Sequence, residues 1–404
     1  MWALIINCKY GKLERRGRRV GVCGDRGICV MRRILVLAVW LLTPVLAAAQ
    51  SAPTGGAIIY ASSYGVLANT GADETISMQA ALTACSGDVL QLPAGQINIS
   101  STLIGSAPCI VAGTGSSAGF SPANPAATNV NEITVGQGGF AFASIDGVVV
   151  RDLGITMPLG AAGNGILIQS GAINNLNRGS HIQNVSVWGG GTSVYLFHSA
   201  NYTVKDSFLL NFSQDGIYAD TDSNMPDIGD SEISGNTIWD FNVTTGNAGI
   251  RLDPQGGMEI LGNKLLGATF GIWLTVSQGP TGTLNIAQNS LEQQNVAHVY
   301  IQQTNSAATY ADITITGNEM ENYGISTFQD GIAVTNPGAQ YLQDLAITGN
   351  TIRDCGTLYG LINIQSVTGA AITGNILDGC GSGTPGVSLG SNAIDVTQTG
   401  NVVH

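Results

Sequence analysis

The chain of 404 residues has few charged and few aromatic side chains, 10% and 6% respectively. Beyond residue 50 only six Lys or Arg remain against 25 Asp or Glu, a net charge of −19. Nucleic-acid phosphates are held by clustered Lys and Arg, so the sequence argues against a nucleic-acid partner. From residue 145 onward no run with helical periodicity occurs, which excludes a helical bundle.

Glycine is abundant by contrast, with 55 residues, and a short signature ending in Asn recurs at intervals of 25 to 32 residues. A period of that size is typical of solenoids. Each repeat contains three short β-type segments and Gly-rich turns, which predicts one coil of a right-handed parallel β-helix. About ten coils are expected over residues 145–404. The recurring residues are Asn236, Asn263, Asn289, Asn318, Asn350, Asn375 and Asn401.

Asn suits this repeated turn for two reasons. It tolerates left-handed backbone conformations, and stacked Asn amides can hydrogen-bond from one coil to the next. Asn184, Asp152 and Asp206 are weaker forms of the signature, and we expect them to take the ladder role in earlier coils.

The first fifty residues form a separate class, with nine Lys or Arg and two acidic residues. Met31-Arg-Arg33, the apolar run Ile34–Leu46 and Ala47-Ala-Ala49 are typical of a secretory signal, which makes Met31 the expected start. A membrane anchor is the alternative, but the run is short for a span. We predict a secreted or periplasmic protein with no membrane span in the mature chain. Its expected divisions are a leader (1–50), a cap with the first coil (51–110) and the β-helix (111–404).

Four cysteines follow the leader. Cys355 and Cys380 each lie five residues after a repeat Asn in consecutive coils. Neighbouring parallel strands are about 4.8 Å apart, a separation that a disulfide can bridge. We therefore expect this bond, and a second one between Cys85 and Cys109. The alternative is four buried free thiols.

A short helix is expected near residues 74–85, with Ile76, Ala80, Ala81 and Leu82 as its apolar positions, and it predicts a cap over the first coil. The runs Gly71-Ala-Asp-Glu-Thr75, Met78-Gln-Ala-Ala-Leu82 and Leu92-Pro-Ala-Gly95, with Cys85, resemble the start of pectin lyase-like β-helix proteins. The closest resemblance is to the segment of rhamnogalacturonases and epimerase-type pectate lyases.

This resemblance implies kinship with family 28 polygalacturonases and with phage tail depolymerases, and therefore action on polysaccharides. The chain contains neither the Asn-Thr-Asp, Asp-Asp, Gly-His-Gly and Arg-Ile-Lys set of polygalacturonases nor the Asp-Pro-His-Asp motif of alginate epimerases. The fold is therefore better indicated than the reaction.

The strands that follow the Gly-rich turns can be aligned. Alternate side chains face opposite sides of a strand, so the Ile and Leu positions point inward and the others outward. The first outward row, the aromatic row, contains Leu167, Tyr195, Tyr218, Arg251, Trp273, Tyr300, Ala333 and Asn363. The second, the polar row, contains Gln169, Phe197, Asp220, Asp253, Thr275, Gln302, Thr335 and Gln365.

A line of exposed aromatic side chains is a surface on which sugar rings stack, and neighbouring polar groups hydrogen-bond to hydroxyls. We therefore expect Tyr195, Tyr218, Trp273 and Tyr300 to bind polysaccharide together with Gln302. Loops that fold over the aromatics and bury them as a satellite core are the alternative. His298, close to Tyr300, is a further candidate for binding sugar, although a lone His at a strand start is more often structural.

Asp220 and Asp253 occupy the same strand position on adjacent coils. Two carboxyls that close repel, so one is expected to stay protonated as a general acid and the other ionised, as glycosidic hydrolysis requires. Arg251 lies beside them and is expected to steady charge in the transition state. The alternative is a pair of solvated surface carboxylates.

Asp220, Asp222 and Asp227 also lie in an acidic segment of the kind that Ca²⁺ prefers. The second expectation is therefore a calcium-dependent polysaccharide lyase, in which Arg251 is the one available base. A solvated acidic turn without an ion is the alternative. A non-catalytic surface adhesin is the third expectation for function. Pairing of the last coil with another copy of the chain predicts a homo-oligomer.

Overall fold

The computed structural model describes the backbone of residues 56–115, 131–135, 139–143, 145–170, 177–221, 229–240, 246–253, 256–277, 282–304, 311–323, 330–335, 342–355, 360–379 and 385–404. These residues lie in one compact unit, and the leader lies outside the described residues. The expected disulfide between Cys355 and Cys380 also cannot be placed, because Cys380 and the side chain of Cys355 are outside the described part.

The strands form three parallel ladders, and each coil contributes one segment to each ladder. Ladder 1 contains β1 (Ile58–Tyr60), β2 (Val89–Gln91), β5 (Ile110–Ala112), β8 (Val149–Leu159), β11 (His181–Gly190), β14 (Thr203–Lys205), β17 (Ser231–Ser234), β20 (Met258–Leu261), β23 (Leu284–Ala287), β26 (Ile313–Thr316), β29 (Gln343–Thr348), β31 (Gly360–Thr373) and β33 (Val387–Thr399). Ladder 2 contains β3 (Gly95–Ile99), β6 (Asn131–Val135), parts of β8 and β11, β15 (Phe208–Leu210), β18 (Thr237–Asp240), β21 (Lys264–Gly267), β24 (Ser290–Glu292), β27 (Glu319–Tyr323), β30 (Thr351–Cys355), β32 (Ile376–Asp378) and β34 (Val402–Val403).

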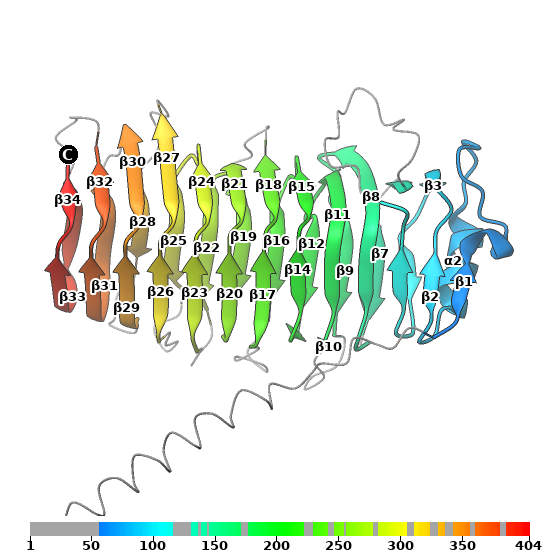
Figure 1. Cartoon of the computed structure of the whole chain (residues 1–404), viewed down its shortest axis with the longest axis horizontal. Helices are drawn as coiled ribbons and strands as arrows, with labels where there is room; N and C mark the ends of the chain where they lie inside the picture. Colours follow the sequence, from blue (N-terminus) through cyan, green and yellow to red (C-terminus); the bar gives the residue numbers. More distant parts are fainter. Residues whose placement is uncertain are drawn as a thin grey trace, which may run out of the picture. The chain divides into compact units, whose positions relative to one another are not determined.

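Ladder 3 contains β4 (Leu103–Gly105), β7 (Phe140–Ala143), β9 (Ile166–Gln169), β12 (Val194–Phe197), β16 (Asp215–Asp220), β19 (Ala248–Asp253), β22 (Phe270–Val276), β25 (Ala297–Gln303), β28 (Asp330–Thr335) and the first parts of β31 and β33. A small separate pair joins β10 (Asn177–Arg178) to β13 (Ser199–Ala200). Each strand pairs in parallel with the corresponding strand of the next coil, so the coils follow one another in chain order (Figure 1). The predicted parallel β-helix is therefore confirmed, and its strand pairing extends before residue 145, back to β1.

Stacked aliphatic side chains fill the interior of the coils. The inward positions of ladder 3 are at most 2% exposed from β9 to β31, as the alternation of the strand sequences predicts. One such stack contains Ile166, Val194, Ile217, Ile250, Ile272, Val299, Ile332 and Ile362. Because every coil contributes the same positions, burial of this core depends on neighbouring coils being present.

The repeat Asn residues form a continuous amide ladder between ladders 1 and 2. The Nδ2 of Asn263 donates to Oδ1 of Asn289 at 3.0 Å and to the carbonyl of Ile233 at 2.9 Å, and the other repeats do the same. From Asn263 onward each Oδ1 accepts from the preceding Asn, as Asn289 does from the Nδ2 and backbone N–H of Asn263. The predicted ladder is confirmed.

The left-handed residue of this turn is not the Asn, as expected, but the residue before it. That position has a φ of about +57° to +66° in the later repeats and holds Gly in all of them except one, where it holds Gln288. Asn is therefore selected for its amide and Gly for its backbone.

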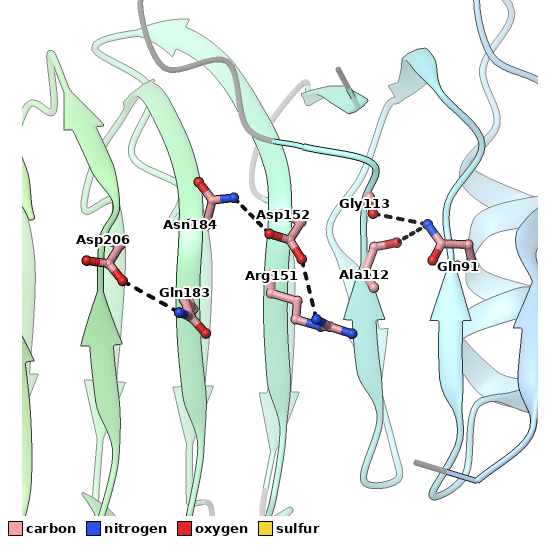
Figure 2. Close-up of polar contacts among 8 residues, drawn as sticks. All are labelled: Gln91, Ala112, Gly113, Arg151, Asp152, Gln183, Asn184 and Asp206. Carbon is pink, nitrogen blue, oxygen red and sulfur yellow. Dashed lines mark hydrogen bonds and ion pairs between the residues drawn. The ribbon is translucent and has the colours of Figure 1, made fainter. Parts of the chain in front are cut away.

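Asp152, Asn184 and Asp206 take this left-handed position too, with φ of 51° to 58°, so their assignment to the ladder position was wrong by one residue. Ser207 occupies the ladder position instead: its Oγ accepts the backbone N–H of Val185 at 3.2 Å, and its own backbone N–H donates to Oδ1 of Asn236. In Figure 2 the outward side chains make a second polar line, in which Asn184 donates to Asp152 at 2.8 Å.

The N-terminal cap contains η2 (Ala61–Tyr64) and α2 (Thr75–Ala84), and α2 packs against β4. The predicted helix is confirmed, but Ile76 is 87% exposed and the buried face is formed by Met78, Ala81 and Leu82. Figure 1 shows α2 beside the first strands of the stack. Cys85, directly after the helix, forms a disulfide with Cys109, with Cα atoms 5.5 Å apart.

Candidate functional site

The outer face of ladder 3 has the register that the sequence alignment predicts. Tyr195 pairs with Tyr218, Tyr218 with Arg251, Arg251 with Trp273, and Trp273 with Tyr300. In the polar row, Phe197 pairs with Asp220 and Asp220 with Asp253. The side chains of the aromatic row thus lie next to one another on consecutive coils, about 4.8 Å apart at the backbone.

The aromatic row forms a continuous stack with Arg251 inserted in it. The rings of Tyr195 and Tyr218 are 5.0 Å apart and nearly parallel. The Arg251 guanidinium lies 4.8 Å from the ring centre of Tyr218 and 4.4 Å from that of Trp273. Such cation–π contacts stabilise a cation that is partly removed from water.

This stacking changes how a sugar can meet the aromatic row. Tyr218 has Tyr195 on one face and Arg251 on the other, so its ring faces are occupied and only its edge and hydroxyl are presented outward. Phe270 stacks on Tyr300 at 4.7 Å and belongs to a small apolar cluster with Ala248, Ala297 and Ala333. The four predicted aromatic residues are half-buried, so the row is partly a satellite core and partly a surface.

The two carboxyls of the polar row have different partners. The hydroxyl of Tyr195 donates to Oδ2 of Asp220 at 3.0 Å. Burial raises the pKa of Asp220, but hydrogen bonds from Tyr195 and Tyr218 oppose this shift by favouring the ionised form. Burial raises the pKa of Asp253 to about 6, and the charge of Asp220 adds to the rise, while the hydroxyl of Ser277 donates a hydrogen bond that opposes it.

Asp215 is a third carboxyl on this face, and the sequence alignment did not identify it. It is 4% exposed, accepts a backbone hydrogen bond from Ala248 at 2.9 Å, and its Oδ2 lies 4.0 Å from Nη1 of Arg251. Burial raises its pKa to about 6, against the attraction of Arg251. Arg251 is therefore held by two ring faces and by one buried carboxyl.

Asp330 occupies the equivalent strand-start position four coils further on. It is 5% exposed, and its Oδ1 accepts the amide of Asn363 at 3.2 Å. A sequence signal for both residues exists, because Asp215 and Asp330 each begin an Asp-Gly-Ile run at the start of a ladder 3 strand. The rule that successive side chains face opposite sides assigned the first residues of these strands to the wrong face. This signal was therefore missed.

His298 is wrongly predicted as a sugar-binding residue. Its side chain is fully buried, and its Nδ1 pairs with Oε1 of Gln294 inside the coil. It stands where neighbouring coils have Gly271 or Gly331, and the ladder skips this position between the paired residues. The irregularity turns His298 inward, whereas strict alternation would turn it outward like Tyr300. Gln302 remains on the outer face, half-buried, beside Thr275 and Thr335.

The calcium expectation cannot be placed in full. Asp222 and Asp227 lie outside the described residues. Among the residues that are described, no group of three His, Cys, Asp or Glu could hold a metal ion. The described side chains alone therefore do not form a calcium site, and Asp220 instead accepts a hydrogen bond from Tyr195.

Comparison with known proteins identifies the fold. The family described as "Right handed beta helix region" matches residues 164–336, which include the whole of the site. No curated protein matches the chain in sequence. Together with the ladders, this match makes the protein a right-handed parallel β-helix, the fold of the pectin lyase-like superfamily that its N-terminal motifs resemble.

Several solved structures share this fold at low sequence identity. The A-module of the mannuronan C-5 epimerase AlgE4 of Azotobacter vinelandii has a TM-score of 0.60 and 17% identity, over 85% of this chain and 97% of that one. The catalytic unit of a GH87 α-1,3-glucanase of Streptomyces thermodiastaticus has a TM-score of 0.56 and 16% identity, over 88% and 70%. PfbA, a surface adhesin of Streptococcus pneumoniae, has a TM-score of 0.59 and 13% identity, over 86% and 90%.

Proposed function

We propose that the protein binds a polysaccharide on the outer face of ladder 3 and hydrolyses a glycosidic bond with Asp220 and Asp253. The observation that carries this proposal is the pairing of the two carboxyls on adjacent coils, both partly withdrawn from water and beside Arg251. Two neighbouring carboxyls in different surroundings can take the roles of general acid and general base. The structural neighbours include an epimerase and a glucanase, which is compatible with a glycan substrate.

The hydrogen bonds favour one assignment of roles. Asp253 has a pKa of about 6 and is the better general acid, since it keeps its proton in mildly acidic solution. Asp220 receives hydrogen bonds from two phenols that favour its ionised form, which suits a base or a nucleophile. The Arg251 guanidinium then offsets negative charge near the pair.

The sugar is proposed to lie across the edges of the stack. The hydroxyls of Tyr195, Tyr218 and Tyr300 and the amide of Gln302 supply hydrogen bonds, because the inner ring faces are occupied within the stack. A surface of this kind selects hydroxyl groups by hydrogen bonding.

The test is a screen of the purified protein against dextran, laminarin, galactomannan, polygalacturonate and alginate, with mass analysis of the products. Asp253→Asn should lower turnover 10²- to 10⁴-fold, roughly the contribution of a general acid, and leave binding in place. Asp344→Asn, at an exposed position of β29 in ladder 1, is the matched control and should keep full activity. Equal activity of Asp253→Asn and the wild type would refute the acid role.

The two alternatives give different results in the same screen. A calcium-dependent lyase would release unsaturated products that absorb ultraviolet light and would stop on addition of chelator. The stacking of Arg251 and its pairing with Asp215 argue against it as a base. A non-catalytic adhesin would retain one of the glycans and release no product from any of them.

We also propose that the protein is exported. The signal-like segment from Met31 to Ala49 and the acidic, base-poor sequence after it support export. Among the described residues, no helix has the length and apolar character to cross a bilayer.

A further inference from the structure

The outer face of ladder 3 changes shape in its last two coils. Ile364 of β31 pairs with Leu389 of β33, but the next pair is Ser366 with Asn392, so two residues of β33 stand opposite Gln365 alone. A bulge of this kind bends the strand and aims side chains in a new direction. Gly390 permits it, because a Cβ there would lie 2.6 Å from the carbonyl oxygen of Gln365.

The bulge coincides with a pocket of about 430 Å³. This volume lies within the range of roughly 300 to 1,000 Å³ found for small-ligand sites. The lining side chains are amides, hydroxyls and one Leu, with no charged residue: Asn363, Gln365, Ser388, Leu389, Ser391 and Asn392, with Gly390. Leu389 also lines the pocket, but it pairs with the inward residue Ile364, so the outward side chains of the pocket are polar.

The pocket lies on the same face as the acidic pair. The aromatic row continues from Tyr300 through Ala333 to Asn363 and Ser388. Asn363 is therefore four coils from Arg251, or roughly 19 Å along the stack. Its side chain is 6% exposed and is held by the carboxyl of Asp330 at 3.2 Å, so one wall of the pocket is fixed in place.

We propose that this pocket is a second saccharide subsite and that it takes an uncharged sugar unit. Amides and hydroxyls both donate and accept hydrogen bonds, as sugar hydroxyls do. A uronate or sulfate group would meet no cation among the lining residues, so no opposite charge would offset the cost of removing its own charge from water. The inference rests on the proposed function, because it makes the pocket a subsite for the same polymer, which then runs along the stack of coils.

The test combines the Asp253→Asn background, which prevents turnover, with a residue that fills the pocket. Ser391→Trp is the filling variant, and Gln365→Ala removes one amide with little risk to folding. Thr399→Trp is the matched control, because it is exposed on the same strand but in ladder 1. Retardation in native gels containing laminarin, galactomannan, dextran, polygalacturonate or alginate gives the affinity for each polymer.

We expect Ser391→Trp to weaken retardation by a neutral polymer at least fivefold and Gln365→Ala at least twofold, with Thr399→Trp unchanged. A trisaccharide of the same polymer should bind at the acidic pair and is too short to reach the pocket. Its affinity should therefore be equal for the Asp253→Asn protein with and without Ser391→Trp. If both pocket variants are retarded by the neutral polymers as strongly as the Asp253→Asn protein, the subsite proposal is wrong. It is also wrong if only the acidic polymers retard the Asp253→Asn protein.

The two proposals fail separately in this design. If wild type cleaves a polymer but the pocket variants bind and cleave it normally, the subsite is wrong and hydrolysis stands. If the pocket variants lose binding but no polymer is ever cleaved, the subsite stands and hydrolysis is wrong. Absence of both binding and cleavage for all five polymers would overturn both.

Discussion

Asp220 and Asp253 are the same residue at the same strand position, yet their surroundings give them different chemistry. Asp220 accepts hydrogen bonds from phenols, and Asp253 lies beside the charge of Asp220 with one hydroxyl donor, Ser277. Asp215 adds a buried counter-charge for Arg251. The properties of the face therefore depend on contacts between coils, which bring together residues about 25 to 35 positions apart in sequence.

The pH dependence of hydrolysis follows from these contacts. Activity requires Asp253 to be protonated, so kcat/KM should fall as the pH rises above about 6, the pKa of its carboxyl. It should also fall in acid, as Asp220 becomes protonated. A profile of kcat/KM from pH 3 to 9 checks both limbs, and a rate that still rises from pH 6 to 8 would contradict the assignment.

Asp330 gives a stability prediction at the residue scale. Burial raises its pKa to about 7 from the ordinary value of 3.8, so the folded protein binds this proton more tightly than the unfolded chain. Stability from this carboxyl is therefore full at low pH and is lost as the pH rises from about 4 to about 7. Asp330→Asn should match the wild type at pH 4 and exceed it by on the order of 1 kcal/mol at pH 8.

Chemical denaturation at both pH values measures this difference. Asp330→Ala is the companion variant, because it removes the oxygen that accepts the amide of Asn363. It should destabilise the protein at both pH values. A wild type that is more stable than Asp330→Asn at pH 8 would show that the buried charge has a favourable partner.

At the scale of the elements, the coils are joined by more than strand pairing. The Asn ladder satisfies its own amides and also backbone groups at each turn, and the left-handed residue before it gives the chain its corner. The ladder is therefore a structural repeat, and the outer face of ladder 3 is where the repeat is least regular in its side chains.

Removing one rung tests the ladder. Asn289→Ala removes the oxygen that accepts a hydrogen bond from Asn263. It also removes the amide nitrogen that donates to Oδ1 of Asn318 and to the carbonyl of Ile260, and all these groups lie in a buried turn. Each unsatisfied buried group costs roughly 1 to 3 kcal/mol, so we expect a loss of at least about 2 kcal/mol in the free energy of unfolding. Asn285→Ala, half-buried on the outer side of β23, is the control and should change stability by less than about 0.5 kcal/mol.

The disulfide between Cys85 and Cys109 ties the end of the cap helix to the start of β5 across 24 residues. Closing a loop of this length stabilises a fold by roughly 2 to 4 kcal/mol. The double variant Cys85→Ser and Cys109→Ser should therefore lower the thermal midpoint, and reducing agent should lower that of the wild type but not that of the variant. Identical midpoints with and without reductant in the wild type would argue against a stabilising bond.

On the scale of the whole molecule, the sequence after residue 50 is acidic, with a net charge of −19. Export is the prediction that belongs here. We expect the exported mature protein to begin near Gln50. Mass spectrometry of its N-terminal peptide measures this start. Leu37→Arg, which interrupts the apolar run, should keep the protein in the cytoplasm, and Arg15→Leu, before Met31, should have no effect. An exported protein that retains residues 31–49 would point to an anchor.

The period of the repeat determined the fold, because parallel coils place equivalent residues side by side and a strand alternates its faces. The positions of the Asn ladder and the register of Asp220 with Asp253 followed from these two rules. The cap helix followed from its apolar spacing and its resemblance to known proteins, although Ile76 proved to be exposed.

Only the tertiary structure shows which way the side chains point where the alternation of inward and outward positions along a strand is interrupted. The irregularity at the start of the ladder 3 strands turns His298 inward and Asp215 outward, and the bulge opposite Gln365 makes a pocket. The stacking of Arg251 between two rings also depends on side-chain packing across coils. A sequence specifies which residues meet through its period, but the direction of each side chain at an irregular position is set by the space that neighbouring coils leave for it.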